Sequence, residues 1–416
     1  MKILFLSSYF APEQVASSYL YDNCYQAYAS EGYDMVVYTP IPCRGITEKL
    51  RETYKTRTYE LLYDGKMVVH RFPLMREKEN TFQRALRYGI MCLKQIYFSV
   101  FAKDAQNCDL LFISSTPPIQ GAMTALVKKI KKIPVIYNLQ DIFPDSLVGT
   151  GLARNGSLLW RIGRVIENFT YKNADKIIVI SQDFKRNIVK KGVPEDKIEV
   201  IYNWVDEKAV VDIPRQNNVL FDRYNLDRAK FYITYSGNIG HTQNMDMLIS
   251  VAEFIEKKYP DIIFVLIGEG AYKRALEEKV RSKHLANIIF LPFQPYKEIS
   301  HVFSLGDAGL VISKPGVGAN SVPSKTWSIM SASRPILANF DENELKDIIQ
   351  DNRCGIFTKA GDIDGFINSI LTLYNHRELC QIYGRNGRNF IMNNLTKDIG
   401  TQKYINVIKK LPKKNF

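Results

Sequence analysis

The sequence predicts an α/β protein made of parallel sheets, and three observations lead to this fold class. Short runs rich in Ile, Val and Leu alternate with helical patterns from one end of the chain to the other. The runs are nearly continuous in apolar residues, which is typical of strands that helices cover on both faces. The length of 416 residues favours two domains over a single core.

The predicted strands fall into two groups. Those of the first group are KILFLSS, DMVVYTP, MVVHRF, DLLFISS, IPVIYNL, KIIVIS and KIEVIYN, and those of the second are FYITYSG, IIFVLIG, IIFLPF, AGLVIS and RPILANF. A polar stretch, residues 206–230, separates the groups and is predicted to be a linker. We therefore expect two Rossmann-like domains with a cleft between them, at residues 1–205 and 206–395. Residues 396–416 are expected to form a C-terminal helix and basic tail that return to the first domain.

The signatures of several function classes are missing from the sequence. The six cysteines include no C-x-x-C pair and no His at metal-binding spacing, so reduced thiols and no metal are expected. None of the five histidines stands in a recognisable nucleophilic triad. Residues 110–127 carry no charge, but Pro117-Pro118 divides them into a strand and a helix rather than a membrane span. The net charge of +13 lies mostly in the first half, which favours an anionic partner surface, either phospholipid or nucleic acid.

A candidate anion site lies in the stretch SVPSKTWSIMSASRPILANF, residues 321–340. A turn that ends at Lys325 is predicted to open a helix, and Arg334-Pro335 is predicted to end it before the next strand. The first N–H groups of a helix lack internal partners and the helix dipole is positive there. Ser324 and Lys325 are therefore predicted to bind an anion.

Two glycine turns follow predicted strands of the second group. SGNIG contains Gly237 and Asn238, and GEG contains Gly268, Glu269 and Gly270. Glycines at these positions permit tight turns and the close approach of phosphate oxygens to the backbone. Each turn taken alone is equally compatible with a structural role, since any strand-to-helix turn can use glycine.

A carboxylate follows a predicted strand of the first group. Asp141, in the segment NLQDIFPDS, stands at a strand end, where it can face a cleft. Asp is also a frequent cap of a following turn, so a structural role is the alternative.

The order of these motifs resembles a known family. ADKIIVISQDFKRNIVKKGVPEDKIEVIYNWVD at 174–206 is followed by YSGNIG, LIGEG, the LPF turn at 291–293, GDAGLVIS and the PSK segment. With these motifs the chain resembles, over nearly its whole length, the retaining nucleotide-sugar glycosyltransferases of the GT-B fold, family four (group 1). Asn203-Trp204-Val205-Asp206, with Trp where most members have Gly, and the segment QDIFPDS at 140–146 are similar to one branch. That branch transfers N-acetyl-L-fucosamine and related deoxyaminosugars in bacterial surface polysaccharides.

The resemblance implies a function and a set of site residues. The expected reaction moves a sugar, an N-acetylated deoxyhexose, from a UDP-sugar to a polyprenyl-diphosphate-linked saccharide, with retention of configuration and without a metal or other cofactor. Asp141 and Lys325 are the expected catalytic residues. The expected nucleotide-sugar-binding residues are Gly237, Asn238, Gly268, Glu269, Gly270, Pro292, Phe293, Ser313, Asn320, Ser321, Ser324, Lys325 and Ser328.

The chain departs from the family pattern at several positions. Asn320 and Ser328 occupy the places of two glutamates that most members have around the nucleotide-sugar. Asn238 and Gln243 stand where many members hold the diphosphate with an Arg and a Lys, and Gln140-Asp141 replaces a His-Asp pair. The charge of a departing diphosphate grows in the transition state, so it still needs a cation. Lys325 is the remaining candidate.

Two other functions are compatible with the sequence. One is a UDP-sugar 2-epimerase of the same architecture, and the other is a non-catalytic basic membrane or nucleic-acid binder. A glycosyltransferase with a lipid-linked acceptor is expected in the cytoplasm, peripheral on the inner membrane and without a nucleic-acid partner.

One segment of the first domain is predicted to dock on that membrane. In residues 81–105 basic and apolar side chains are interleaved, which suits the headgroup boundary. These side chains are Arg84, Arg87, Lys94 and Lys103, with Phe82, Leu86, Ile90, Leu93, Tyr97, Phe98 and Phe101. A partly buried helix with solvated arginines is the alternative.

Overall fold

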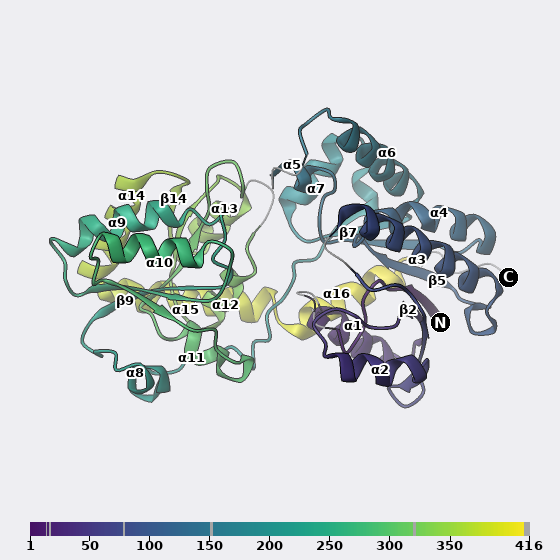
Figure 1. The fold of residues 1–416 in the computed structure, drawn as a ribbon, viewed down its shortest axis with the longest axis horizontal. Helices are drawn as coiled ribbons and strands as arrows, with labels where there is room; N and C mark the ends of the chain where they lie inside the picture. The colour runs from purple at the N-terminus through teal and green to yellow at the C-terminus, as the bar shows by residue number, and fades with distance from the viewer. Residues whose placement is uncertain (14, 16–17, 78–79, 150–152, 319–321, 412–416) are drawn as a thin grey trace. The chain divides into compact units, whose positions relative to one another are not determined.

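The computed structural model describes residues 1–411 apart from residues 14, 16–17, 78–79, 150–152 and 319–321. Its contacts divide the chain into two compact units. The first unit comprises Met1–Tyr202 together with the C-terminal segment that begins at Thr401, and the second comprises Asn203–Gly400. Each unit contains one sheet with its own helices (Figure 1).

The first sheet has eight strands in the order β3-β4-β2-β1-β5-β6-β7-β8. Its strands are β1 (Lys2–Leu6), β2 (Asp34–Pro40), β3 (Tyr59–Leu62), β4 (Met67–Phe72), β5 (Leu110–Ser114), β6 (Val135–Leu139), β7 (Lys176–Val179) and β8 (Ile198–Val200). Strands β2 to β4 extend the sheet on one side of β1, and strands β5 to β8 extend it on the other. The strands are therefore added to the sheet in one direction up to β4 and in the opposite direction from β5 onward. The reversal point lies between β1 and β5, which pair in parallel.

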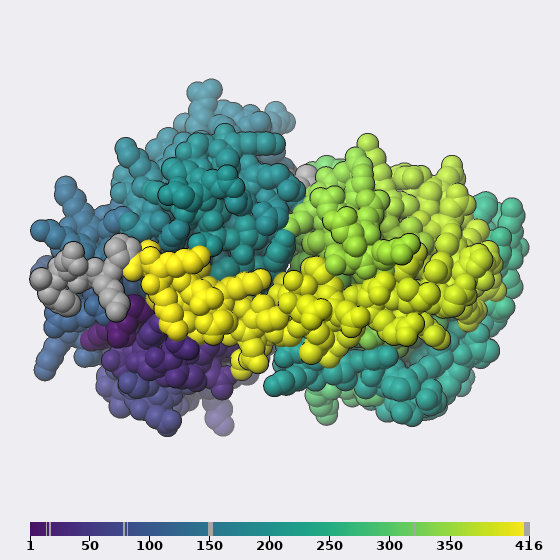
Figure 2. Space-filling model, turned by 180° about the vertical axis from the view of Figure 1, so that it is seen from behind, coloured from purple at the N-terminus to yellow at the C-terminus, as the bar shows by residue number. Residues whose placement is uncertain are grey.

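Helices cover both faces of this sheet, as right-handed parallel crossovers in opposite directions require. The helices of the first unit are α1 (Ser18–Ser30), α2 (Glu48–Thr56), α3 (Thr81–Phe101), α4 (Ile119–Lys131), α5 (Asp145–Gly149), α6 (Leu158–Asn173) and α7 (Gln182–Lys190). Helix α4 packs against both α3 and α6, so these three lie side by side on the sheet (Figure 1). The C-terminal helix α16 (Lys397–Lys409) lies beside α1, where Lys409 and Glu31 form an ion pair at 2.7 Å. Figure 2 shows this helix in yellow against the purple N-terminal segment.

The second sheet has six parallel strands in the order β11-β10-β9-β12-β13-β14. They are β9 (Phe231–Ser236), β10 (Ile262–Ile267), β11 (Ile288–Leu291), β12 (Ala308–Ile312), β13 (Ile336–Phe340) and β14 (Gly355–Lys359). The helices of this unit are α8 (Val219–Arg223), α9 (Met245–Glu256), α10 (Lys273–Ser282), α11 (Ile299–Phe303), α12 (Lys325–Ser331), α13 (Glu344–Asp351), α14 (Ile363–Asn375) and α15 (Arg377–Asn394). Single 3₁₀ turns occur at Lys103–Ala105, Glu195–Lys197, Arg215–Asn217 and Tyr296–Glu298.

The predicted strands are confirmed, but two edge strands are additional. Every apolar run named above forms a strand, and the central strands of both sheets are buried along most of their length. Strands β3 and β14 lie at sheet edges and were not predicted. In β3, Tyr59 and Leu61 are 51% and 56% exposed, so the segment lacks the continuous apolar run of a central strand. Strand β3 also pairs antiparallel with β4, so the first sheet is not purely parallel.

Trp204, the residue that replaces glycine in the family pattern, is buried near the start of the second unit. Its side chain is 1% exposed. A Cβ atom on Gly400 would lie 2.1 Å from the Trp204 ring, so the chain at residue 400 can approach the indole only because it lacks a side chain. All six cysteines are free thiols, as predicted.

Candidate functional site

Several of the predicted site residues lie at one edge of the second sheet. The order in which strands are added to this sheet reverses between β9 and β12. Ligands of open α/β sheets bind beyond the C-terminal strand ends at such a reversal point. Gly237 and Asn238 follow β9, and Ser313 follows β12. These residues therefore occupy the position at which the fold favours a ligand.

Lys325 begins helix α12, as predicted, and its side chain reaches the end of β9. Its ammonium nitrogen lies 3.5 Å from the centroid of the Tyr235 ring, and a Cβ on Gly237 would be 3.2 Å from it. Within the described residues, Lys325 forms no ion pair and no hydrogen bond. Loss of water around the ammonium lowers the pKa of Lys325 to about 7. The site thus contains an amino group for which the described part of the chain supplies no counter-ion.

Tyr235 was not identified from the sequence, although it shapes this edge. The residue is fully buried, and its hydroxyl donates a hydrogen bond to the carbonyl oxygen of Asn238 at 2.6 Å. Burial raises the pKa of Tyr235, so the ring stays neutral and presents its negative face to the ammonium of Lys325. Gly237 lies close to the Lys325 ammonium and has φ of +136°, which a residue with a side chain rarely adopts.

Gly268 and Gly270 accommodate protein backbone. A Cβ on Gly268 would lie 1.9 Å from the carbonyl oxygen of Gly237, and one on Gly270 would lie 2.2 Å from that of Ile239. The amide of Ile239 donates to the carbonyl oxygen of Glu269 at 2.8 Å. The two glycine turns therefore pack against each other. Gly268 and Gly270 are thus in contact with protein backbone, as expected for glycines with a structural role.

The polar side chains of these turns have different surroundings. Gln243 accepts a hydrogen bond from the Gly240 amide at 2.9 Å, so it holds the turn closed. The Asn238 side chain lies close to the same glycine and is exposed. Glu269 is exposed and forms an ion pair with Lys273 at 2.7 Å. Of these side chains, that of Asn238 is the one left accessible beside Gly237.

Serine hydroxyls contribute to the same edge. Ser313 is 4% exposed, and its hydroxyl finds no hydrogen-bond partner in the described part of the chain. Buried hydroxyls are normally bonded, so this one is available to a ligand atom. Ser324 is exposed at the start of α12 and caps it with no side-chain bond, and Ser328 lies one turn beyond Lys325. Asn320 and Ser321 lie outside the described residues.

Pro292 and Phe293 follow β11, which is separated from β9 by β10. Phe293 is 73% exposed, so its ring is free to stack on a planar group. The structure thus places this pair at the outer end of the same sheet edge, away from Lys325.

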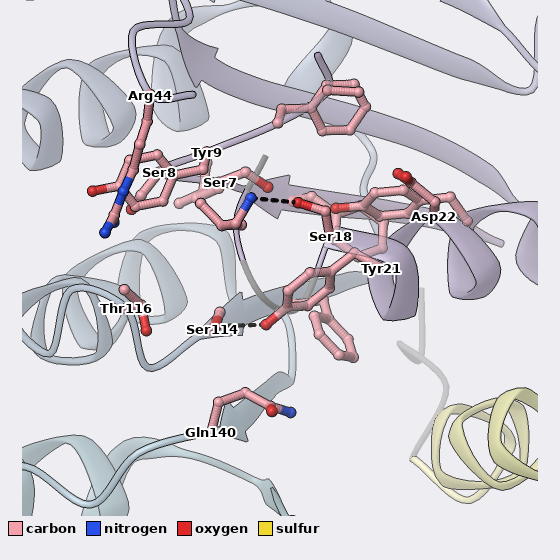
Figure 3. A pocket seen from close by; sticks show the side chains of 17 residues that line it. Ser7, Ser8, Tyr9, Ser18, Tyr21, Asp22, Arg44, Ser114, Thr116 and Gln140 are labelled. Carbon is pink, nitrogen blue, oxygen red and sulfur yellow. Dashed lines mark hydrogen bonds between the residues drawn. The ribbon is translucent and has the colours of Figure 1, made fainter. Parts of the chain in front are cut away.

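The first unit contains a pocket of about 360 Å³ at its own reversal point (Figure 3). The pocket is lined by residues that follow β1, β5 and β6, together with residues of α1 and the loop after β2. Its lining residues include Ser7, Ser8, Tyr9, Phe10, Tyr21, Asp22, Tyr25, Arg44, Phe112, Ser114, Thr116 and Gln140. Aromatic walls with hydroxyl, amide and charged groups suit a saccharide, which presents apolar C–H faces and many hydroxyls.

A chain of hydrogen bonds connects Tyr21, Ser114 and Gln140, which line this pocket, with Asn138 and Tyr404, which do not. Tyr21 and Ser114 join their hydroxyls at 2.7 Å, as the dashed line in Figure 3 shows. The amide of Asn138 donates to the Tyr21 hydroxyl, and its oxygen accepts from Gln140 at 3.0 Å and from Tyr404 of α16 at 3.2 Å. Gln140, the residue at the family's histidine position, is therefore oriented toward the pocket by its neighbours.

Charged groups occupy the rim of the pocket. Arg44 is exposed, stacks over the Tyr9 ring at 5.4 Å, and forms no ion pair among the described residues. The loop that carries Arg44 is fixed by buried Glu13, whose carboxylate accepts from the amides of Cys43 and Arg44 at 2.8 and 3.0 Å. Asp22 lines the pocket from α1, and loss of water raises the pKa of its carboxyl. Arg44 and Asp22 were not identified from the sequence, because no local motif surrounds them.

Asp141 follows β6, as predicted, but it does not line this pocket. Its carboxylate accepts a hydrogen bond from the Ser146 hydroxyl at 2.9 Å at the start of α5. Burial of the carboxyl raises its pKa, and the bond from Ser146 partly opposes this effect. The residue thus has the contacts of a turn cap and also a carboxylate that the solvent reaches.

No group of three or more His, Cys, Asp or Glu residues in the described ranges is arranged to bind a metal ion. The expectation of a metal-free reaction stays a prediction.

Two models of known families match the chain. The model described as Glycosyltransferase Family 4 matches residues 20–209, and the model described as Glycosyl transferases group 1 matches residues 217–390. The chain belongs to the group 1 glycosyltransferases. Both models therefore favour a transferase over the epimerase and the non-catalytic binder.

Among curated proteins, this glycosyltransferase is 26% identical to the Escherichia coli glycosyl transferase WcaI, which is named for colanic acid biosynthesis. That alignment spans 336 residues and covers 80% of this chain and 81% of WcaI. This chain is also 25% identical to the Pseudomonas aeruginosa glycosyltransferase WbjE. That alignment spans 287 residues and covers 68% of this chain and 70% of WbjE.

Solved structures share its fold. HepE from Anabaena, solved in complex with UDP, has a TM-score of 0.73 at 17% identity and matches over 99% of this chain and 100% of HepE. WaaG, a glycosyltransferase of lipopolysaccharide biosynthesis, has a TM-score of 0.69 at 12% identity over 98% and 100% of the two chains. The GT-B fold is therefore confirmed, and the N-acetyl-L-fucosamine branch stays a prediction.

Proposed function

We propose that this glycosyltransferase transfers a sugar from a UDP-sugar to a saccharide carried on a polyprenyl diphosphate, in the synthesis of a bacterial surface polysaccharide. The observation that carries the proposal is the ammonium of Lys325, which lies beside Gly237 at the C-terminal strand ends of the second sheet and has no counter-ion among the described residues. The names of WcaI and WaaG support a polysaccharide or lipopolysaccharide product, and HepE, a neighbour in fold, was solved with UDP bound. The transferred sugar is proposed to be an N-acetylated deoxyhexose.

The donor diphosphate would complete the surroundings of Lys325. Negative phosphate oxygens favour the protonated ammonium, and the interaction strengthens as charge accumulates on the departing diphosphate. The hydroxyl of Ser313 and the exposed side of Gly237 offer further contacts to the donor. The exposed ring of Phe293 is proposed to stack on the base.

The acceptor saccharide is proposed to bind in the pocket of the first unit. Asp22, Gln140 and Arg44 supply groups that can hydrogen-bond its hydroxyls, and Asp141 is proposed to contact the acceptor or the transferred sugar. The acceptor hydroxyl attacks the anomeric carbon on the face from which the diphosphate leaves. Its oxygen forms the new glycosidic bond, the bond from the anomeric carbon to the phosphate oxygen breaks, and the hydroxyl proton passes to the departing phosphate. This front-face displacement retains the anomeric configuration.

The test uses the purified full chain with UDP-, GDP- and dTDP-sugars. A UDP-sugar should raise the melting temperature, because a ligand that binds only the folded state stabilises it. UDP release should then require a lipid-linked saccharide, and the anomeric configuration of the product should match that of the donor by NMR. Conversion of the UDP-sugar to its 2-epimer without an acceptor would instead establish the epimerase. An absence of any effect of nucleotide sugars would overturn the proposal.

A further inference from the structure

An unusual share of the exposed apolar side chains of the first unit comes from three adjacent helices. Those of α3 are Phe82, Leu86, Leu93, Tyr97 and Phe101, those of α4 are Ile119, Leu126 and Ile130, and those of α6 are Leu158, Leu159, Ile162, Val165 and Phe169. Within each helix most of these residues recur at intervals of three, four or seven, so they form one stripe along the helix. We call the surface formed by the three stripes the three-helix face.

The stripes point to the same side of the molecule. Helix α4 packs between α3 and α6, and the three lie side by side on the sheet (Figure 1). Met91 of α3, Val127 of α4 and Tyr171 of α6 are buried in the core, on the sides of their helices that face the sheet. The exposed stripes are therefore turned away from the sheet and toward solvent. Contiguous apolar patches of this extent are rare on proteins that bind nothing there.

The charged residues of these helices are basic with one exception. Their basic residues are Arg84, Arg87 and Lys94 on α3, Lys128, Lys129 and Lys131 on α4, and Arg161, Arg164 and Lys172 on α6. The sequences of the three helices contain a single acid, Glu167, which is 5% exposed and bonded to Arg164, Lys191 and Tyr171. Lys129, Arg161 and Lys172 are exposed at the edges of the stripes. Arg84, Lys128 and Arg164 form ion pairs with Glu77, Asp175 and Asp145 of neighbouring segments, so the positive border of the three-helix face consists of the exposed Lys129, Arg161 and Lys172.

We propose that the three-helix face docks the first unit on the surface of an anionic phospholipid membrane. A bilayer surface offers what this face requires, since apolar side chains can enter the acyl boundary while basic side chains contact anionic headgroups. A second copy of the chain would bring two positive faces together, so charge disfavours self-association. No helix in the described ranges is both long and apolar enough to cross a membrane.

The surface differs from the single segment expected from the sequence. Arg87, predicted to contact headgroups, is 1% exposed and donates from Nε to the carbonyl oxygen of Met75 at 3.0 Å. Phe98 packs into the core and stacks on Tyr38. These two residues therefore do not belong to the docking surface, whereas α4 and α6, which the sequence analysis did not consider, contribute most of it.

Helices α3 and α4, which carry part of the three-helix face, extend to the pocket of the first unit. Tyr88 of α3 hydrogen-bonds the hydroxyl of Tyr9 on the pocket rim at 3.0 Å, and α4 begins shortly after Thr116, which lines the pocket. A saccharide on a lipid in the same membrane would therefore lie near the pocket. This use of the surface rests on the proposed function, but the docking itself does not.

Vesicle co-sedimentation of the full chain tests the proposal with phosphatidylcholine vesicles and with vesicles that also contain phosphatidylglycerol. A charge variant carries Lys129→Glu, Arg161→Glu and Lys172→Glu. An apolar variant carries Leu93→Gln, Leu158→Gln and Val165→Gln, at residues that are 68%, 75% and 68% exposed. A control with the same change in net charge carries Lys257→Glu, Arg274→Glu and Arg281→Glu on exposed positions of the second unit.

The wild type and the control should bind the anionic vesicles, and the charge variant should bind them about a hundredfold less tightly, since each of three headgroup contacts is lost. The apolar variant should also lose binding. Circular dichroism and thermal melting verify folding, and if the apolar variant fails to fold, the charge variant decides. Equal binding by the wild type and the charge variant, or no binding by the wild type, would overturn the proposal. A wild-type dimer that the charge variant lacks, without vesicle binding, would assign the face to self-association instead.

Transfer to a short-chain, water-soluble acceptor separates this proposal from the proposed function. Both surface variants should retain that activity, because none of the substituted residues lines the pocket or the edge at Lys325. If the wild type binds vesicles but transfers no sugar, the docking surface stands and the proposed function fails.

Discussion

The ammonium of Lys325 lies over the ring of Tyr235, 3.5 Å from its centroid, although the two residues belong to α12 and β9. An aromatic face stabilises a cation only in part, and no carboxylate in the described residues completes the neutralisation. The pair therefore places an amine with a lowered pKa at the strand ends of the second unit, where a bound anion would favour its protonated form.

Replacement of Lys325 with Ala should lower the rate constant at saturating donor by on the order of a hundredfold. Removal of one group that stabilises transition-state charge typically costs about 3 kcal/mol. Stability should stay the same or rise, because the variant no longer desolvates a cation without a partner. Steady-state kinetics and thermal melting measure both effects, with Lys297→Ala at an exposed site as the control. Unchanged turnover in Lys325→Ala would exclude the residue from the mechanism.

The stability of the protein should depend on pH through Lys325. Its pKa falls from 10.5, the ordinary value, to about 7 in the folded chain because of desolvation. Between these pH values the unfolded chain binds the proton and the folded chain does not, so stability rises with pH from about 7 to 10.5. Below pH 7 both states bind it, and the dependence disappears. Urea unfolding of wild type and Lys325→Met across this range should show a difference that shrinks as the pH rises, and a constant difference would contradict the lowered pKa.

The affinity for UDP should change with pH in the opposite direction. Binding of the diphosphate favours the protonated ammonium, so above pH 7 each complex must take up a proton. Calorimetric titrations should give a dissociation constant that rises by up to about tenfold per pH unit above 7. Buffers of different ionisation enthalpy should reveal proton uptake. Lys325→Arg should bind UDP without this dependence, because guanidinium stays charged throughout. An identical pH profile in that variant would place the titration elsewhere.

Substitution of Gly268 with Ala should weaken donor binding and destabilise the second unit by about 1–3 kcal/mol. The new Cβ would lie 1.9 Å from the carbonyl oxygen of Gly237, and φ of +153° is unfavourable for alanine. Displacement of the Gly237 turn should then raise the dissociation constant for UDP. Gly89→Ala is the matched control, because apart from its own helix turn and its neighbours in sequence no atom lies within 4 Å of the new Cβ, and a helix interior favours alanine. A Gly268→Ala variant with wild-type melting and UDP affinity would show that the two turns do not depend on each other.

Two carboxylates of the first unit can be assigned by conservative substitution. Asp22→Asn should lower kcat/KM for the acceptor about tenfold or more, since a charge-assisted hydrogen bond is worth about 1.5–3 kcal/mol.

Asp141→Asn should lower turnover with little change in melting temperature if the residue contacts a substrate. Unchanged turnover together with a lower melting temperature would instead identify Asp141 as the cap of the turn at Ser146.

The local sequence pattern was sufficient to predict the central strands and the start of α12. The runs at β1, β6 and β9 are apolar at nearly every position because both faces of a central parallel strand are buried. The turn before Lys325 contains proline and serine, whose backbone preferences start a helix. The edge strands β3 and β14 were not predicted, because a half-exposed strand needs no continuous run of apolar residues.

The sequence by itself thus determined the fold class, the order of the strands along the chain and the position of Lys325 at a helix start. Only the tertiary structure decided which groups meet that lysine, that the Gly268 turn packs on the Gly237 turn, and that Arg87 is buried. The pocket of Tyr21, Ser114 and Gln140 is likewise assembled from three segments. Helices and strands follow from periodicity within one segment, whereas such contacts depend on strand order, which brings together residues distant in sequence.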